Sequence, residues 1–320
     1  MATRRFETRR AVVLFDARRA TVPSHQIQGA HMHDITLISP SQLNGGEAGG
    51  FPMEQFTLQF LAQGDSWFSI GSIPPFLTSN LFDKMSLSQT AVAVNCARPG
   101  AELQHMTNTT SNRTFLQLLN GKAARRWTAL LLSGLGNDVM SAAQSPASSP
   151  AATRLLAKKS EWTTATGAAR YISEAGWQTF SQHAVDVFQV LVQNRDKSAV
   201  NRGIPIVLHT YDFVTARNAG AGAGFGPWLF KAFTAFEIPA ADWDALAKLL
   251  LARVRSLILS IAAADPTIHV VDTQGTLIPA LNTDVGPTVH WQNEIHPTRT
   301  GYRLLGDAWE ARLERLFCGA

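Results

Sequence analysis

The chain has 320 residues, of which 45% are hydrophobic and 16% charged, and its formal net charge is +4. This is enough apolar material for one large core. The longest apolar stretches are too short or too interrupted to span a bilayer, so we expect no transmembrane segment.

Residues 1–50 show no sustained periodicity and end in a Gly-rich stretch at 44–50. We therefore predict an irregular N-terminal extension. Arginines cluster in its first twenty residues, which we interpret as a basic tail and not as a nucleic-acid surface, because such a surface needs a basic stripe on a folded element. The apolar run at 11–15 is too short for a secretory signal, and Cys96 and Cys318 show no disulfide pattern. Both features favour a cytoplasmic protein.

From about residue 56 the pattern alternates between apolar strands and helices. The predicted strands are Phe56–Ala62, Ala91–Val94, Trp127–Leu132, Ile204–Leu208 and Ile268–Val271. The predicted helices are Pro74–Met85, Asn112–Leu119, Glu174–Asn194, Pro239–Ala264 and Thr298–Phe317. Strands that are apolar throughout and separated by helices indicate a parallel sheet covered on both faces. We expect an α/β domain over 51–320, with three α/β/α layers and a five-stranded sheet.

Two stretches interrupt this alternation. The first, 141–153, is rich in Ser, Ala and Pro. The second, 217–236, begins with alternating Gly and Ala and continues with bulky aromatic residues. It suits a lid or a pocket wall, and it suits core filling under a long connection equally well.

Polar residues follow the ends of the predicted strands. Ser66 lies in Gly-Asp-Ser after the first strand, and Gly100 lies in Pro-Gly after the second. Asn137 follows the third strand in Gly-Asn-Asp, and His296 follows the fifth in His-Pro-Thr. Because strands of a parallel sheet end at one edge, where ligands bind in open α/β folds, we expect these groups to converge.

This set of groups is the one that acyl transfer needs. A serine hydroxyl is a weak nucleophile, and His296 can take its proton near neutral pH. We expect the pH profile to show a basic limb for His296 ionisation at about pH 6–7. The tetrahedral intermediate needs preorganised donors for its oxyanion. The backbone N–H groups of Ser66 and Gly100 and the side-chain amide of Asn137 are the candidates.

The four short blocks around Ser66, Gly100, Asn137 and His296 resemble those of the SGNH/GDSL hydrolases. The resemblance spans residues 56–317. It implies a flavodoxin-like sheet and hydrolysis of a small carboxylic ester through an acyl-serine intermediate, without a metal or another cofactor.

The sequence departs from the family pattern at two positions. Leu135 stands where the family usually has a glycine, and Asn293 stands where it usually has an aspartate that orients the histidine. Three ways to orient His296 are open: Glu294 replaces the aspartate, Asp272 serves instead, or the carbonyl of Asn293 suffices. We favour Glu294 slightly.

Two alternatives to an esterase remain. An acyltransferase would share the chemistry and pass the acyl group to an alcohol or a sugar. A weakly active binding module would keep the fold without efficient turnover, and Asn293 favours this reading because an amide offers no charge to the imidazolium. The sequence pattern identifies neither the ester that serves as substrate nor the oligomeric state.

Overall fold

Six parallel strands form the central sheet, in the spatial order β2-β5-β3-β6-β7-β8. They are β2 (Thr36–Ile38), β3 (Leu58–Gly64), β5 (Ala91–Asn95), β6 (Ala129–Ser133), β7 (Ile206–His209) and β8 (Ile268–Val271). An antiparallel pair joins β1 (His33–Asp34) to β4 (Ser86–Leu87). The structure is a computed structural model, which describes residues 31–43, 50–69, 79–108, 110–164, 166–222 and 224–319.

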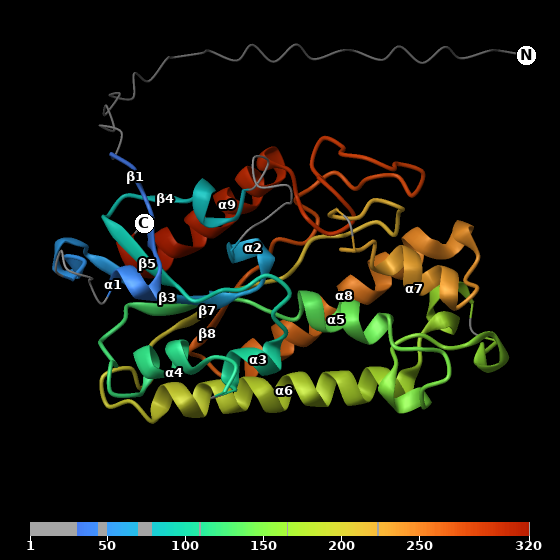
Figure 1. Ribbon diagram of the computed structural model, residues 1–320, viewed down its shortest axis with the longest axis horizontal. Helices are drawn as coiled ribbons and strands as arrows, with labels where there is room; N and C mark the ends of the chain where they lie inside the picture. Colours follow the sequence, from blue (N-terminus) through green and yellow to red (C-terminus); the bar gives the residue numbers. More distant parts are fainter. Residues whose placement is uncertain are drawn as a thin grey trace, which may run out of the picture. The chain divides into compact units, whose positions relative to one another are not determined.

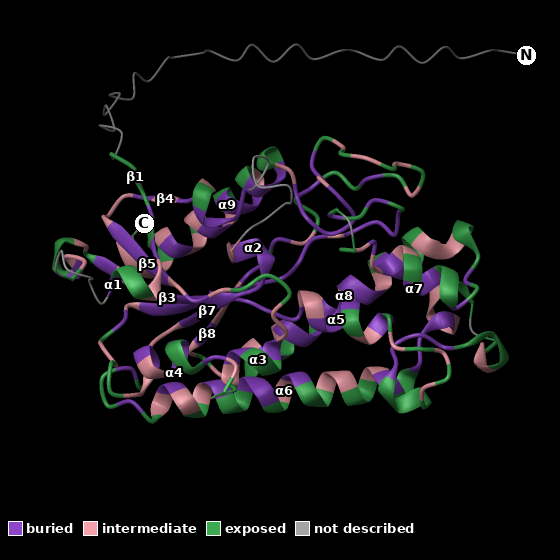
Figure 2. Cartoon of the chain, viewed as in Figure 1, coloured by how far each residue is buried: buried purple, intermediate pink, exposed green. Residues whose placement is uncertain are grey.

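Helices cover both faces of this sheet, with α9 on one side and α6 on the other (Figure 1). The helices are α1 (Pro40–Leu43), α2 (Ser66–Ser69), α3 (Leu103–Thr107), α4 (Arg113–Leu119), α5 (Gly136–Ala143), α6 (Glu174–Asp196), α7 (Leu229–Ala235), α8 (Trp243–Ala264) and α9 (Arg299–Leu313). The central strands are buried, whereas α6 is buried along one side only (Figure 2). The core therefore lies between the sheet and the inner faces of the helices.

Local sequence explains where the long helices begin. The hydroxyl of Ser173 accepts a hydrogen bond from the Gly176 N–H (3.3 Å) and caps α6. Thr298 caps α9 in the same way through the Gly301 N–H (3.2 Å). Such caps satisfy backbone donors that have no partner within the helix.

The α/β/α class with a parallel sheet is confirmed, but the strand count was wrong, since the sheet has six strands and not five. The sixth strand, β2, pairs in parallel with β5. It lies in residues that we expected to be irregular, and three residues are too few for a periodic signal. The contacts of the chain place Met32–Ala320 in one unit.

Short helices were also missed. Both α5 and α7 lie at least partly within the stretches that we read as irregular, and α3 was not predicted. Residues 74–78 of the helix predicted at Pro74–Met85 lie outside the described residues. The described remainder, 79–85, is not α-helical, and only Phe82–Lys84 form one turn of 3-10 helix.

The strand order places a switch point between β3 and β6. Strands β5-β3-β6-β7-β8 follow the flavodoxin-like order 2-1-3-4-5, and β2 adds one strand outside β5. The chain leaves β3 toward β5 on one side and leaves β6 toward β7 on the other. In such sheets the crevice beyond the carboxyl ends at the switch point is where ligands bind. Ser66 follows β3, and Asn137 follows β6.

Candidate active site

Ser66 and His296 are in direct contact although 230 residues separate them. The Oγ atom of Ser66 lies 2.8 Å from Nε2 of His296. Ser66 is the first residue of α2, directly beyond β3, and His296 lies in the loop before α9. This is the distance at which a base can take a hydroxyl proton.

Asp65 fixes the turn that carries Ser66. Its carboxylate accepts hydrogen bonds from the Trp67 N–H (3.0 Å), the Ser133 hydroxyl (2.7 Å) and the Tyr211 hydroxyl. The preceding Gly64 packs so closely on β6 that an added Cβ would lie 2.7 Å from the Cβ of Ser133. Asp65 therefore holds this turn in place, and burial raises its pKa to about 6.

Asn293 makes the contact that orients His296. Its Oδ1 lies 3.1 Å from Nδ1 of the imidazole. The same oxygen accepts hydrogen bonds from the backbone N–H groups of Ile295 (3.1 Å) and His296 (2.9 Å). An amide oxygen can only accept, so Nδ1 carries the proton and Nε2 keeps its lone pair toward Ser66.

The slight preference for Glu294 as the orienting group was wrong. Its buried carboxylate accepts hydrogen bonds from four backbone N–H groups instead: those of Arg217 (3.3 Å), Trp228, Leu229 (3.1 Å) and Phe230 (2.7 Å). Glu294 thus holds the start of α7, where the N–H groups lack partners within the helix. Asp272 bonds to Arg255 and to the Thr210 hydroxyl, so its side chain is also engaged elsewhere.

A small cavity lies beside Ser66, lined among others by Gly136 and Asn137. Its volume is about 20 Å³, which is room for one water-sized group. The side-chain amide of Asn137 donates to the Ala101 carbonyl at 3.1 Å, and an amide carries a second N–H. The backbone N–H of Ser66 donates to no acceptor in the described part of the chain.

Gly100 is not among the residues described as lining this cavity. It is exposed and lines an adjoining hollow, together with Ala101 and Arg98. Its φ of +74° is in the left-handed region that favours glycine. Ala101 connects the two spaces, because its carbonyl accepts the hydrogen bond from Asn137.

The turn after β6 forms despite Leu135. This buried leucine adopts φ +81°, a conformation that costs a non-glycine residue about 1–2 kcal/mol. The next residue, Gly136, is needed for close packing: an added Cβ there would lie 2.6 Å from the ring of Tyr211. The left-handed backbone conformation is therefore adopted by Leu135 and not by Gly136.

Burial dominates the electrostatics of His296. Desolvation lowers the pKa of His296 to about 4, because a buried imidazole disfavours its charged form. No carboxylate among the described residues counteracts this, since Asn293 is neutral. This pKa lies below the range of about pH 6–7 in which we expected His296 to titrate.

Two residues near His296 were missed in the sequence. The Trp228 ring lies edge-on to the imidazole, with centroids 5.7 Å apart and an interplanar angle of 80°. The buried guanidinium of Arg217 donates to the carbonyls of Asn293 (2.7 Å) and Asp284 (3.2 Å). Both residues lie in the 217–236 stretch, but nothing in its pattern pointed to His296.

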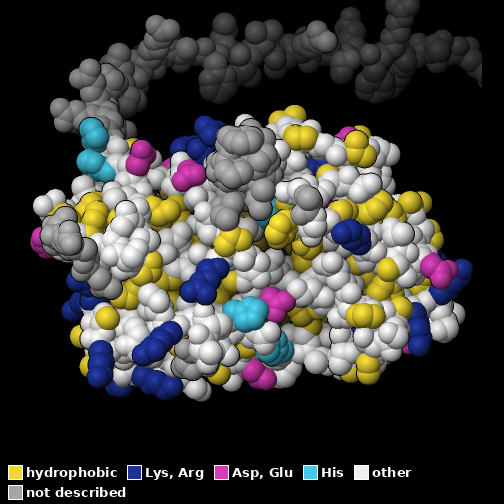
Figure 3. Space-filling view, in the orientation of Figure 1, with side chains coloured by type: hydrophobic (Ala, Val, Ile, Leu, Met, Phe, Trp, Pro, Cys, Tyr) yellow, Lys and Arg dark blue, Asp and Glu magenta, His cyan; other side chains and the backbone are white. Residues whose placement is uncertain are grey.

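Arg217 also anchors the long loop between β8 and α9. Hydrophobic side chains reach the surface in the upper part of the molecule (Figure 3), and the exposed aliphatic residues of this loop are Ile278, Leu281, Val285 and Val289.

No helix in the described ranges is long and apolar enough to cross a membrane.

His209, the last residue of β7, is fully buried. Its Nε2 lies 3.0 Å from the Ser133 hydroxyl, and burial lowers its pKa to about 3. Asp212 is also buried, and its carboxylate accepts hydrogen bonds from the backbone N–H groups of Gly275 and Leu277, both at 2.6 Å. Both residues are therefore packed in the interior.

No family model and no curated protein matches the chain. Solved structures similar to it include the Mycobacterium smegmatis aryl esterase, with 13% identity and a TM-score of 0.44 over 82% of this chain and 100% of that one. An extracellular lipase from Streptomyces rimosus has 13% identity and a TM-score of 0.41 over 79% of this chain and 100% of that one. A putative SGNH hydrolase from Slackia heliotrinireducens has 13% identity and a TM-score of 0.38 over 79% of this chain and 97% of that one. At these values the reaction must be argued from this chain's own residues.

Proposed function

We propose that the protein is a serine hydrolase that cleaves a carboxylic ester through an acyl-serine intermediate. The observation that carries this proposal is the 2.8 Å contact between Ser66 Oγ and His296 Nε2 at the switch point of the sheet. Ser66 attacks the ester carbonyl, and His296 takes its proton and then gives it to the departing alcohol. Water, with His296 again as the base, releases the acid.

The oxyanion would form in the small cavity. The Ser66 N–H and the second N–H of the Asn137 amide are the donors nearest to it, and Gly100 is the neighbouring candidate. Each such donor is worth about 3–4 kcal/mol in the transition state. Asn293 holds the imidazole by a neutral contact of 3.1 Å, so the imidazolium lacks a charged partner. We therefore propose a Ser-His-Asn arrangement with a base that stays neutral down to low pH.

The test is hydrolysis of p-nitrophenyl acetate and butyrate by the wild type and by Ser66→Ala. We expect release of nitrophenol above the spontaneous rate by the wild type alone. Equal rates for the two proteins would refute the mechanism. The same assay with a competing alcohol present, followed by product analysis, separates hydrolysis from acyl transfer.

Asn293 also favours the second candidate, a binding module with weak turnover. Its amide supplies no negative charge to His296, and the Asp-to-Asn change costs about 10⁴ in rate in a serine protease. A wild-type rate no higher than that of Ser66→Ala would support this candidate.

A further inference from the structure

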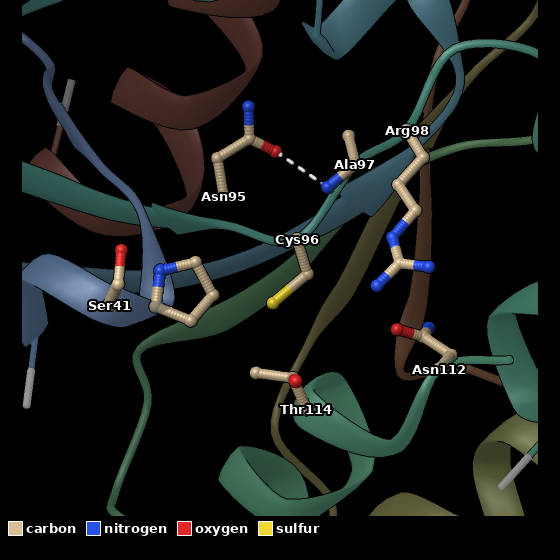
Figure 4. Close-up of a pocket in the computed structure, with 8 residues that line it drawn as sticks. Ser41, Asn95, Cys96, Ala97, Arg98, Asn112 and Thr114 are labelled. Atoms are coloured by element: carbon tan, nitrogen blue, oxygen red, sulfur yellow. Dashed lines mark hydrogen bonds between the residues drawn. The ribbon is translucent and has the colours of Figure 1, made fainter. Parts of the chain in front are cut away.

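Two hollows lie at the carboxyl end of β5, the strand that pairs with β3, which precedes Ser66. One, of about 460 Å³, is lined by Cys96 and Thr114 among others. The other, of about 210 Å³, is lined by Gly100 and His105 among others. Arg98 and Asn112 line both, so the guanidinium lies where the two hollows meet. In Figure 4 the side chain of Arg98 extends from the end of the strand toward Asn112.

The charge of these hollows is positive. No Asp or Glu appears among the described residues that line either of them. Cys96 does not balance the arginine, because burial raises the pKa of its thiol to about 12 and leaves it neutral. In the described part of the chain Arg98 makes no ion pair, and its one side-chain hydrogen bond runs from Nη1 to the Ser111 carbonyl (3.2 Å). Its Nε and Nη2 donors remain free for a ligand.

The backbone ties Arg98 to the nucleophile. Its N–H donates to the Gly64 carbonyl at 2.9 Å, two residues before Ser66. The Asn95 amide donates to the Phe68 carbonyl (2.8 Å) in the helix that begins with Ser66. The backbone of Arg98 is therefore bonded to the end of the strand that precedes Ser66.

We propose that the Arg98 hollow binds an anionic group of the substrate, so that the preferred ester carries a carboxylate or a phosphate on its acyl or its alcohol part. This inference rests on the proposed esterase function. The 20 Å³ cavity beside Ser66 has room for the oxyanion only, so the remainder of the ester must extend beyond it. The hollow lined by Arg98 is within reach, because Ala101 of its lining accepts the hydrogen bond from Asn137 beside Ser66. A planar guanidinium with free donors binds such oxyanions through paired hydrogen bonds.

The experiment compares anionic and neutral esters of matched size. For the acyl part, the pair is the half p-nitrophenyl ester of adipic acid and p-nitrophenyl hexanoate. For the alcohol part, it is 4-acetoxybenzoate and phenyl acetate. Each rate is divided by the spontaneous rate of the same ester, which removes differences in intrinsic reactivity. The readout is the ratio of kcat/KM for the anionic ester to that for the neutral one.

We expect the wild type to prefer the anionic ester in at least one pair. The pair in which this preference appears shows whether the acyl part or the alcohol part of the substrate carries the charge. Arg98→Gln should lower that ratio about tenfold, the usual worth of a charged hydrogen bond. Arg98→Lys should keep part of the preference, and added salt should weaken it in the wild type. The matched control is Arg126→Gln, an exposed arginine that lines a different hollow, which should leave the ratio unchanged.

Two results would overturn the inference. One is a wild type that prefers the neutral ester in both pairs. The other is Arg98→Gln changing both esters of a pair by the same factor. Either result, with Ser66-dependent hydrolysis of the neutral esters intact, refutes the anion site alone. If the wild-type protein shows no Ser66-dependent hydrolysis of any of these esters, the proposed esterase function is refuted. If Arg98→Gln fails to fold, the salt dependence of the wild-type ratio decides.

Discussion

Replacing Asn293 by Asp should strengthen the base at the centre of the site. The new carboxylate would take the position of Asn293 Oδ1, 3.1 Å from Nδ1 of His296, and keep two backbone donors, from Ile295 and His296. An opposite charge at this range raises the pKa of a histidine by about 1 to 3 pH units. The pKa of His296 would then move up from about 4, to about 5–7.

The same interaction stabilises the imidazolium that forms in the transition state. Each pH unit corresponds to about 1.4 kcal/mol, so kcat should rise by about 10- to 1,000-fold well above the pKa. The Asn293 side-chain N–H₂ has no partner in the described structure, so the substitution breaks no hydrogen bond at that atom.

The assay is the pH profile of kcat/KM for p-nitrophenyl butyrate. His296 must be neutral to accept the proton, so activity rises with pH through its pKa, near 4 in the wild type. In Asn293→Asp this limb should move to higher pH. Asp272→Asn is the control, because Asp272 is paired with Arg255 and should leave the limb in place. A folded Asn293→Asp protein with an unchanged limb and rate would refute the reasoning.

Three further predictions concern single side chains. Asn137→Ala should lower kcat about 10²- to 10³-fold through loss of an oxyanion donor, measured by steady-state kinetics; a loss below threefold would contradict its role. Trp228→Ala uncovers the imidazole, so the pKa of His296 should rise toward 6.5 and the acid limb with it; an unmoved limb would show that the ring does not desolvate His296. Glu294→Ala leaves the N–H groups at the start of α7 without an acceptor and should lower the free energy of unfolding by about 3 kcal/mol, measured by urea denaturation; an unchanged midpoint and slope would contradict that anchoring role.

The strands of the central domain were predictable because they are apolar on both faces. All five predicted strands occur, with their ends shifted by up to two residues, and Ile268–Val271 matches at both ends. The edge strand β2 was not predictable, because its three residues contribute to the sheet only through pairing with β5. Tertiary contacts, and not local pattern, decide such an element.

The convergence of Ser66, Asn137 and His296 could be predicted from their positions after parallel strands. The orienting contact could not. Asn293 and Glu294 are neighbours in sequence, and only the turn of the loop decides which of them faces the imidazole. A carboxylate is the stronger partner, so chemistry alone favoured Glu294, but backbone N–H groups of 217–236 take its oxygens. Such long-range pairings leave no mark in the local pattern.

The most direct test of the account is labelling with a fluorophosphonate, which reacts with activated serines and not with ordinary ones. We predict one adduct per chain, located on Ser66 by peptide mass spectrometry, formed at pH 7 and absent in Ser66→Ala and in His296→Ala. An unlabelled wild-type protein, or an adduct that persists in His296→Ala at the wild-type rate, would contradict the claim that His296 activates Ser66.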